Sequence, residues 1–183
     1  LHDLCMKHGV DLKPPQVPEG INLGYFEGIG YGTVIDSLAA IKKLVVEEKK
    51  VSMKEIIDAL KNNFEGKEAL QQLLKAQPCY GNNDPYADEI AKDIDKVFVE
   101  YAKKYNEEMG IHNDIRYVPF TSHVPFGKVV SATPNGRKAY TPLADGPSAP
   151  HGAALNAPTP ILPPHFHPQT YGHPDRAARL PNT

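Results

Sequence analysis

The sequence contains few cysteines and no long hydrophobic run. Its only cysteines, Cys5 and Cys79, do not have the spacing of metal ligands, and we expect no bound metal. No apolar stretch approaches the ~20 residues that a membrane span requires, and no signal-peptide pattern is present. The formal net charge of −2 gives no electrostatic reason to expect nucleic acid or an anionic membrane as a partner. Together these absences favour a reduced, cytoplasmic setting.

The N-terminal part of the chain lacks any clear helical or strand pattern. A length of 183 residues suffices for one domain with a hydrophobic core. We expect residues 1–20 to form an irregular lead-in, because Pro14, Pro15 and Pro18 disfavour a helix. Residues 21–32 combine glycine with apolar and aromatic residues. Glycine at this density predicts close backbone approach or tight turns, and no regular element.

Hydrophobic periodicity predicts a series of helices in the middle of the chain. They are residues 33–48, a helix opened by Ser52, a shorter helix with Leu70, Leu73 and Leu74, and a helix from Pro85 to about Lys104. Ser52 and Glu55 have the capping-box spacing. Asp84 is a good N-cap, and Pro85 suits the first helical position because its missing N–H costs nothing there. The buried stripe of the last helix is expected to contain Tyr86, Ile90, Ile94, Val97, Phe98 and Tyr101.

The composition changes after Gly110. Residues 115–131 are rich in β-branched and aromatic residues, which predicts strands. Residues 133–136 read Thr-Pro-Asn-Gly and predict a turn, since proline pre-sets the first central position and Asn-Gly tolerates positive φ. Ten of the 18 prolines lie in the last 43 residues, which cannot then form a helix or a central strand.

Three separated segments carry recognisable motifs. The first is residues 32–45, the second is residues 80–84 (Tyr-Gly-Asn-Asn-Asp), and the third comprises residues 124–128, 131–137 and 142–146. Their order and spacing resemble the later half of the glycyl radical enzymes of the pyruvate formate-lyase type. The resemblance covers about residues 20 to 180 of this partial chain.

The resemblance implies an α/β fold, because this family forms a ten-stranded α/β barrel wrapped in helices. The chain would supply mainly outer helices and one or two barrel strands. Residues 21–146 would form a partial pyruvate formate-lyase-like domain. Residues 147–183 would be a Pro-rich, degenerate continuation, since several family Ser, Leu or Gly positions are Pro or Ala there. Without the resemblance, the pattern predicts only an α/β or α+β domain.

The motifs that carry the family's radical chemistry are missing. The family places its thiyl cysteine in Gly-Cys-x-Glu and its radical glycine in Arg-Val-x-Gly-Tyr, and neither occurs in this sequence. We therefore expect Cys5 and Cys79 to be ordinary thiols and the chain to hold no catalytic residue. The resemblance implies that the intact parent has the cysteine upstream and the glycine downstream. It also implies a homodimer whose glycyl radical is installed by a radical S-adenosylmethionine activating enzyme.

A substrate-binding role is expected for the segment after residue 115. If residues 116–122 are extended, Arg116, Phe120 and Ser122 share one face. The resemblance places this strand against the active-site cavity, which makes these three the candidate substrate-binding residues. Arginine suits a sulfonate, carboxylate or phosphate, because its fork donates two parallel hydrogen bonds to an oxyanion.

Structural roles are the alternatives for the same residues. Arg116 could instead pair with Asp114, and Phe120 could be a core residue. Ser122 and His123 could make structural hydrogen bonds only. Arg137, in the predicted turn, is expected to be structural.

The segment most resembles the subgroup of the family that cleaves isethionate, a small hydroxyalkyl sulfonate, to acetaldehyde and sulfite. An anionic small-molecule substrate is therefore expected. The enzymatic alternatives are a glycerol/diol dehydratase and a choline trimethylamine-lyase of the same family. The non-enzymatic alternative is a truncated product without function. We expect the chain on its own to be inactive and to fold poorly, because barrel strands without neighbours expose unpaired edges.

Overall fold

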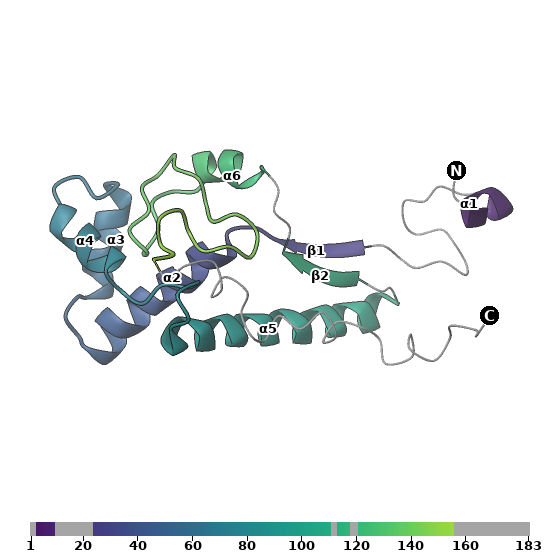
Figure 1. Ribbon diagram of the computed structural model, residues 1–183, viewed down its shortest axis with the longest axis horizontal. Helices are drawn as coiled ribbons and strands as arrows, with labels where there is room; N and C mark the ends of the chain where they lie inside the picture. Colours follow the sequence, from purple (N-terminus) through teal and green to yellow (C-terminus); the bar gives the residue numbers. More distant parts are fainter. Residues whose placement is uncertain (1–2, 10–23, 111–112, 118–120, 156–183) are drawn as a thin grey trace.

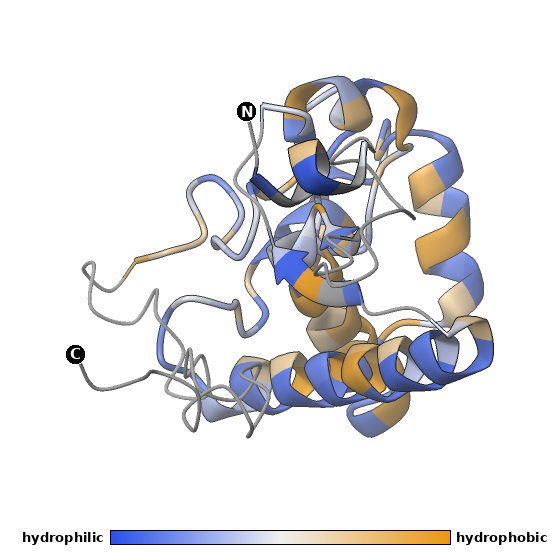
Figure 2. Ribbon diagram, turned by 90° about the vertical axis from the view of Figure 1, so that its right-hand side faces the viewer, coloured by the Kyte–Doolittle hydropathy of each residue, from blue (hydrophilic) through white to orange (hydrophobic). Residues whose placement is uncertain are grey.

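The computed structural model describes residues 3–9, 24–110, 113–117 and 121–155 (Figure 1). Its elements are, in chain order, α1 (Asp3–His8), β1 (Gly24–Gly28), α2 (Tyr31–Ile41), the π-helical turn η1 (Lys42–Glu47), α3 (Met53–Lys61), α4 (Glu68–Lys75), α5 (Pro85–Met109), β2 (Asn113–Tyr117) and α6 (His123–Val129). Hydrophobic and hydrophilic residues alternate along the helical ribbons, as expected of helices that bury one side (Figure 2).

The predicted N-caps of α3 and α5 are confirmed. The Glu55 N–H donates to Ser52 Oγ (3.2 Å) while the Ser52 N–H donates to Glu55 Oε2 (2.7 Å), which completes the capping box. At the start of α5, the Tyr86 N–H donates to Asp84 Oδ1 (2.9 Å), with proline at the first helical position. In both helices, side-chain oxygens close in the sequence therefore accept backbone N–H groups at the first turn, and the helix begins there.

Helix α5 is longer and less buried than predicted. It continues past Lys104 to Met109 and ends where Gly110 adopts φ 63°, a left-handed conformation that glycine accepts readily. Ile90 is buried, but Val97, Phe98 and Tyr101 are 50, 41 and 70% exposed, so the predicted buried stripe is wrong over the second half of the helix. The reason is that the described chain covers this half only with the short strands β1 and β2 (Figure 1).

Strands β1 and β2 form a two-stranded parallel sheet. In its register Gly24 pairs with Asn113, and Gly28 pairs with Tyr117. The crossover that joins the two strands contains all the helices from α2 to α5, as parallel pairing requires a long connection. Helix α5 runs along the sheet and packs against it (Figure 1).

The prediction of no regular element in residues 21–32 is wrong for β1. The close approach that the glycines predicted is nevertheless present, because a Cβ on Gly28 would lie 2.7 Å from two carbons of the Tyr117 ring. Gly30 adopts φ 83° immediately before α2, as expected for a tight turn. Glycine spacing alone did not reveal that a distant strand would pair with this segment.

Two further predictions about secondary structure are wrong. Residues Asp3–His8 form a short helix inside the expected irregular lead-in, because the prolines that disfavour a helix all lie after it. Residues 115–131 are not strands throughout, since α6 begins at His123. Pro125 falls in the first turn of α6, where its missing N–H is not needed, so it is compatible with this helix. The β-branched residues near it wrongly indicated a strand.

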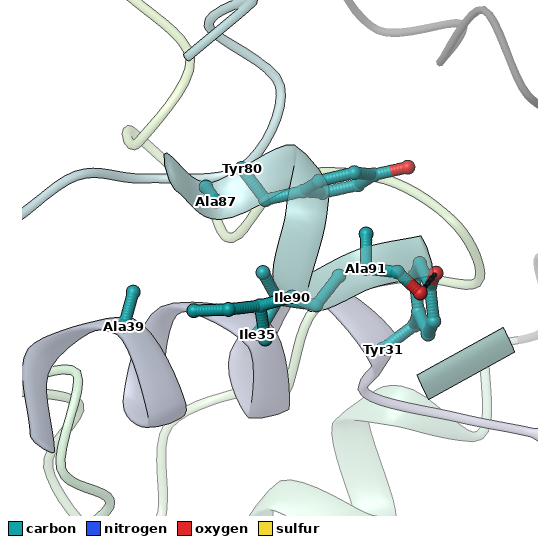
Figure 3. Packing of buried hydrophobic residues seen from close by; sticks show 7 residues of the cluster. All are labelled: Tyr31, Ile35, Ala39, Tyr80, Ala87, Ile90 and Ala91. Carbon is teal, nitrogen blue, oxygen red and sulfur yellow. Dashed lines mark hydrogen bonds between the residues drawn. The ribbon is translucent and has the colours of Figure 1, made fainter. Parts of the chain in front are cut away.

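The buried hydrophobic side chains of the described residues form two clusters. In the first, α2 packs on α5, and the loop residue Tyr80 covers both helices; its members are Tyr31, Ile35, Ala39, Tyr80, Ala87, Ile90 and Ala91 (Figure 3). The Tyr31 hydroxyl donates to the Ala91 carbonyl (3.0 Å) and so fixes the two helices against each other. The second cluster joins α2 and η1 to α3 and α4 through Leu44, Ile56, Phe64 and Leu74.

Candidate functional site

The two faces of the small sheet have different surroundings. Phe26 contacts Tyr105 of α5, with ring centroids 5.5 Å apart, and the Tyr117 hydroxyl donates to Asp95 of α5 (2.7 Å). Because successive side chains of a strand point to opposite faces, Tyr25, Glu27 and Arg116 must lie on the face away from α5. In a barrel wrapped by helices, the face away from the helices is the interior one.

Arg116 stacks on a neighbouring aromatic ring. Its guanidinium carbon Cζ lies 3.4 Å from the centroid of the Tyr25 ring, and the side chain is exposed. Glu27 is its register partner, yet the two side chains form no ion pair. Among the described residues, Arg116 therefore has an aromatic neighbour and no carboxylate partner. The side chain of Asp114, the predicted alternative partner, lies outside the described part of the chain.

The other two predicted site residues are not shown beside Arg116. Phe120 lies outside the described residues. Ser122 is half-buried and has helical dihedrals (φ −56°, ψ −25°) at the N-cap of α6, where its side chain makes no capping hydrogen bond. The alternation argument for an extended segment 116–122 is therefore wrong for Ser122, because this residue already belongs to the turn that starts the helix.

His123 connects α6 to the loop that follows it. Its Nδ1 lies 3.5 Å from Asp145 Oδ1, and its carbonyl accepts the Leu143 N–H (3.2 Å). Its ring centroid is 5.9 Å from that of His151. These contacts hold the 143–151 segment against α6, which agrees with the structural alternative for this histidine.

Arg137 organises the turn that the sequence predicted. Its guanidinium donates to five main-chain carbonyls, those of Gly127, Val130, Ser131, Lys138 and Thr141. The Gly136 N–H donates to the Thr133 carbonyl (2.9 Å). Burial lowers the pKa of the Arg137 guanidinium. The guanidinium is thus held by main-chain carbonyls, which agrees with the structural role expected for this arginine.

Asp36 is a buried carboxyl group that the sequence analysis missed. It is 3% exposed, its Oδ1 accepts the Tyr80 N–H (2.7 Å), and burial raises its pKa to about 7. A signal was available, because Asp36 lies three or four positions from Gly32, Thr33, Ala39 and Ala40, which are the small residues of the tightly packed side of α2.

Cys79 lies next to this carboxyl group. Its thiol donates to the Gln77 carbonyl (3.1 Å), and burial together with Asp36 raises its pKa to about 12. A thiol of this kind carries almost no thiolate at neutral pH and is a weak nucleophile. The side chain of Cys5, the other cysteine, lies outside the described residues.

The described chain also contains a cavity of about 970 Å³, apart from the sheet. It lies between α2, α4 and the segment after β2, and Asp36, Gln71, Cys79, Asn82 and Arg137 are among its lining residues. Neither Arg116 nor Ser122 lines it. Within the ranges given above, no group of three His, Cys, Asp or Glu side chains is placed to hold a metal ion. None of the helices there is both long and apolar enough to cross a bilayer.

Comparison with known proteins identifies the family. The pyruvate formate lyase-like family matches residues 1–127. The chain is 68% identical over 182 residues to isethionate sulfite-lyase of Oleidesulfovibrio alaskensis, covering 100% of this chain and 22% of that protein. It is 36% identical over 161 residues to trans-4-hydroxy-L-proline dehydratase of Clostridioides difficile, covering 87% of this chain and 20% of that protein. The chain belongs to the pyruvate formate lyase-like family.

A solved structure shows the same fold. The glycerol-bound B12-independent glycerol dehydratase of Clostridium butyricum superposes with a TM-score of 0.73 at 33% identity, covering 87% of this chain and 20% of that one. The predicted fold class, a fragment of the α/β barrel of glycyl radical enzymes with mainly outer helices and one or two barrel strands, is therefore confirmed. The chain spans about a fifth of the length of these relatives.

Proposed function

We propose that the full-length protein is a glycyl radical lyase that cleaves isethionate to acetaldehyde and sulfite. The high identity to isethionate sulfite-lyase supports the reaction, since it extends over the whole chain. The choice of isethionate as the substrate depends on one observation, the position of Arg116. It lies on the sheet face away from the helix layer and has no carboxylate partner among the described residues.

The substrate chemistry suits these residues. Isethionate carries a sulfonate at one end and a hydroxyl at the other, and a guanidinium donates two parallel hydrogen bonds to such an anion. In this proposal Arg116 binds the sulfonate and Phe120 forms an apolar wall. Ser122 is assigned no substrate contact, because it already belongs to the turn that starts α6. Breaking the C–S bond yields acetaldehyde and hydrogen sulfite, which together contain every atom of the isethionate anion.

The radical itself belongs to other parts of the protein. A glycyl radical supplies hydrogen-atom abstraction through a cysteine, and neither of the family's two motifs for these groups occurs in this chain. The residues present would contribute substrate binding and the wall of the cavity. We expect a cytoplasmic homodimer that a radical S-adenosylmethionine enzyme activates, by resemblance to the family.

A dehydratase of the same family is the second candidate. It is supported by the relatives that carry dehydratase names, at 33 to 36% identity. A neutral diol is matched less well by Arg116, because it gains nothing from a fixed cation, and a choline cation would be repelled. The carboxylate of trans-4-hydroxy-L-proline, by contrast, could also accept hydrogen bonds from a guanidinium, so Arg116 does not argue against that dehydratase. The large difference in identity favours the sulfonate lyase.

The proposal can be tested in the full-length protein after anaerobic activation. Arg116→Ala should lower kcat/KM for isethionate at least about a hundredfold, because two charge-assisted hydrogen bonds are lost. The glycyl radical signal in electron paramagnetic resonance should remain. Lys96→Ala, which removes an exposed cation of α5, is the matched control and should change neither. Unchanged isethionate turnover in Arg116→Ala would contradict the proposal, as would a wild-type enzyme that dehydrates glycerol and ignores isethionate.

A further inference from the structure

The contact between Tyr25 and Arg116 joins the two strands on their helix-free face. Tyr25 belongs to β1 and Arg116 to β2, so the contact exists only because the parallel pair has this register. The separation of 3.4 Å between Cζ and the ring centroid is a face-on contact within the cation–π range. Tyr25 is half-buried, whereas Arg116 is exposed. The ring is thus the better-packed partner, and the guanidinium rests on it.

A face-on ring has a specific effect on an arginine. It covers one flat face of the guanidinium and restricts the rotation of a long side chain, which otherwise loses considerable rotamer entropy when it binds a ligand. It leaves the edge of the group, where the N–H donors point, free to meet an oxyanion. A carboxylate partner would occupy those same donors.

The geometry points to Tyr25 as a positioning residue for the anion-binding Arg116. This inference rests on the proposed function, since it assumes that Arg116 receives the sulfonate. Tyr25 contacts the arginine and is not assigned a contact with the substrate. Its contribution is to keep the Arg116 guanidinium in the orientation that binds the anion, so that the side chain loses less conformational freedom on binding.

Glu27 is the competing neighbour on the same face. It is the register partner of Arg116, and an ion pair between them would hold the guanidinium in another way. No such pair is formed, and the contact that exists is with the aromatic ring. Replacement of the ring should therefore weaken anion binding, and neutralisation of Glu27 should not.

The test is isethionate binding to the full-length protein before activation, measured by titration calorimetry. Tyr25→Phe keeps the π face and should leave Kd within about twofold, whereas Tyr25→Leu removes it and should raise Kd about tenfold. In an Arg116→Gln background, Tyr25→Leu should cause no further change. After activation, KM should rise by the same factor in Tyr25→Leu, while kcat and the glycyl radical signal stay the same.

The outcomes separate the two proposals. Unchanged binding in Arg116→Gln would overturn the proposed function and this inference with it. Weak binding in Arg116→Gln with normal binding in Tyr25→Leu would overturn only the role of Tyr25. That role would also fail if Tyr25→Phe bound as poorly as Tyr25→Leu, if the two substitutions had additive effects, or if Glu27→Gln alone weakened binding. Thermal melting of each variant reports whether it is folded, and Tyr25→Phe provides the folded comparison.

Discussion

Asp36 should make the packing of the Tyr80 loop depend on pH. Its pKa is 3.8 in an exposed carboxyl group and about 7 in the folded protein, with burial as the largest cause. The folded state therefore binds a proton more tightly than the unfolded state. The resulting stability is present at low pH and is lost as the pH rises through 7.

The magnitude follows from these two pKa values. Between pH 5 and pH 8, the linkage relation gives a loss of about 3 kcal/mol in the free energy of opening. Asp36→Asn removes the titrating group while its amide oxygen can still accept the Tyr80 N–H. The variant should therefore lose this pH dependence and be more stable than the wild type at pH 8.

Hydrogen–deuterium exchange of the peptide that contains Tyr80 is the suitable assay in the full-length protein. Exchange rates are corrected for the pH dependence of the chemical step and converted to opening free energies. The difference between the wild type and Asp36→Asn in the free energy of opening should change by about 3 kcal/mol from pH 5 to pH 8. An equal pH dependence in both proteins would refute the reasoning, because another group would then be responsible.

Three further predictions concern packing and reactivity, all in the full-length protein. Gly127→Ala should lower the free energy of unfolding by about 3 kcal/mol, because a Cβ there would overlap the Thr141 carbonyl oxygen. Gly66→Ala is the control, because a Cβ at this position meets open space although φ is 69°, and it should cost only about 1 kcal/mol in chemical denaturation. Equal losses of unfolding free energy in Gly127→Ala and Gly66→Ala would contradict the overlap with the Thr141 carbonyl oxygen. Arg137→Lys should cost about 3 kcal/mol in the same assay, since an ammonium cannot reach five carbonyls, and a loss below about 1 kcal/mol would be inconsistent with the network. Iodoacetamide at pH 8 should modify Cys79 more than about a hundredfold more slowly than a small free thiol, because its pKa is about 12, and rapid alkylation would disprove the assigned environment.

The local features of this chain could be predicted because local contacts produce them. The capping box at Ser52 and the N-cap at Asp84 each need only residues two or three positions away. The turn at residues 133–136 likewise depends on its own glycine and asparagine. Such hydrogen bonds need only the order of these neighbouring residues, so the sequence alone was sufficient to predict the two caps and the turn.

Features that depend on distant partners were missed or only partly predicted. β1 is a strand because β2 pairs with it across a long connection, and its glycines gave no sign of this partner. The exposed second half of α5 has the same pattern as its buried first half, and only the extent of the neighbouring strands distinguishes them. Asp36 is buried because the Tyr80 loop packs over it.

The sequence by itself determined the family, the succession of helices from α2 to α5, the starting points of α3 and α5, and the presence of an arginine suited to an anion. The tertiary structure alone decided that Arg116 lies on the helix-free face and rests on Tyr25 of another strand. It also brought the Ala144 N–H to Thr33 Oγ1 across 111 positions of the chain. The physical reason is that side-chain type and spacing specify hydrogen bonds within a turn or two, whereas strand register and burial arise only when remote segments pack together.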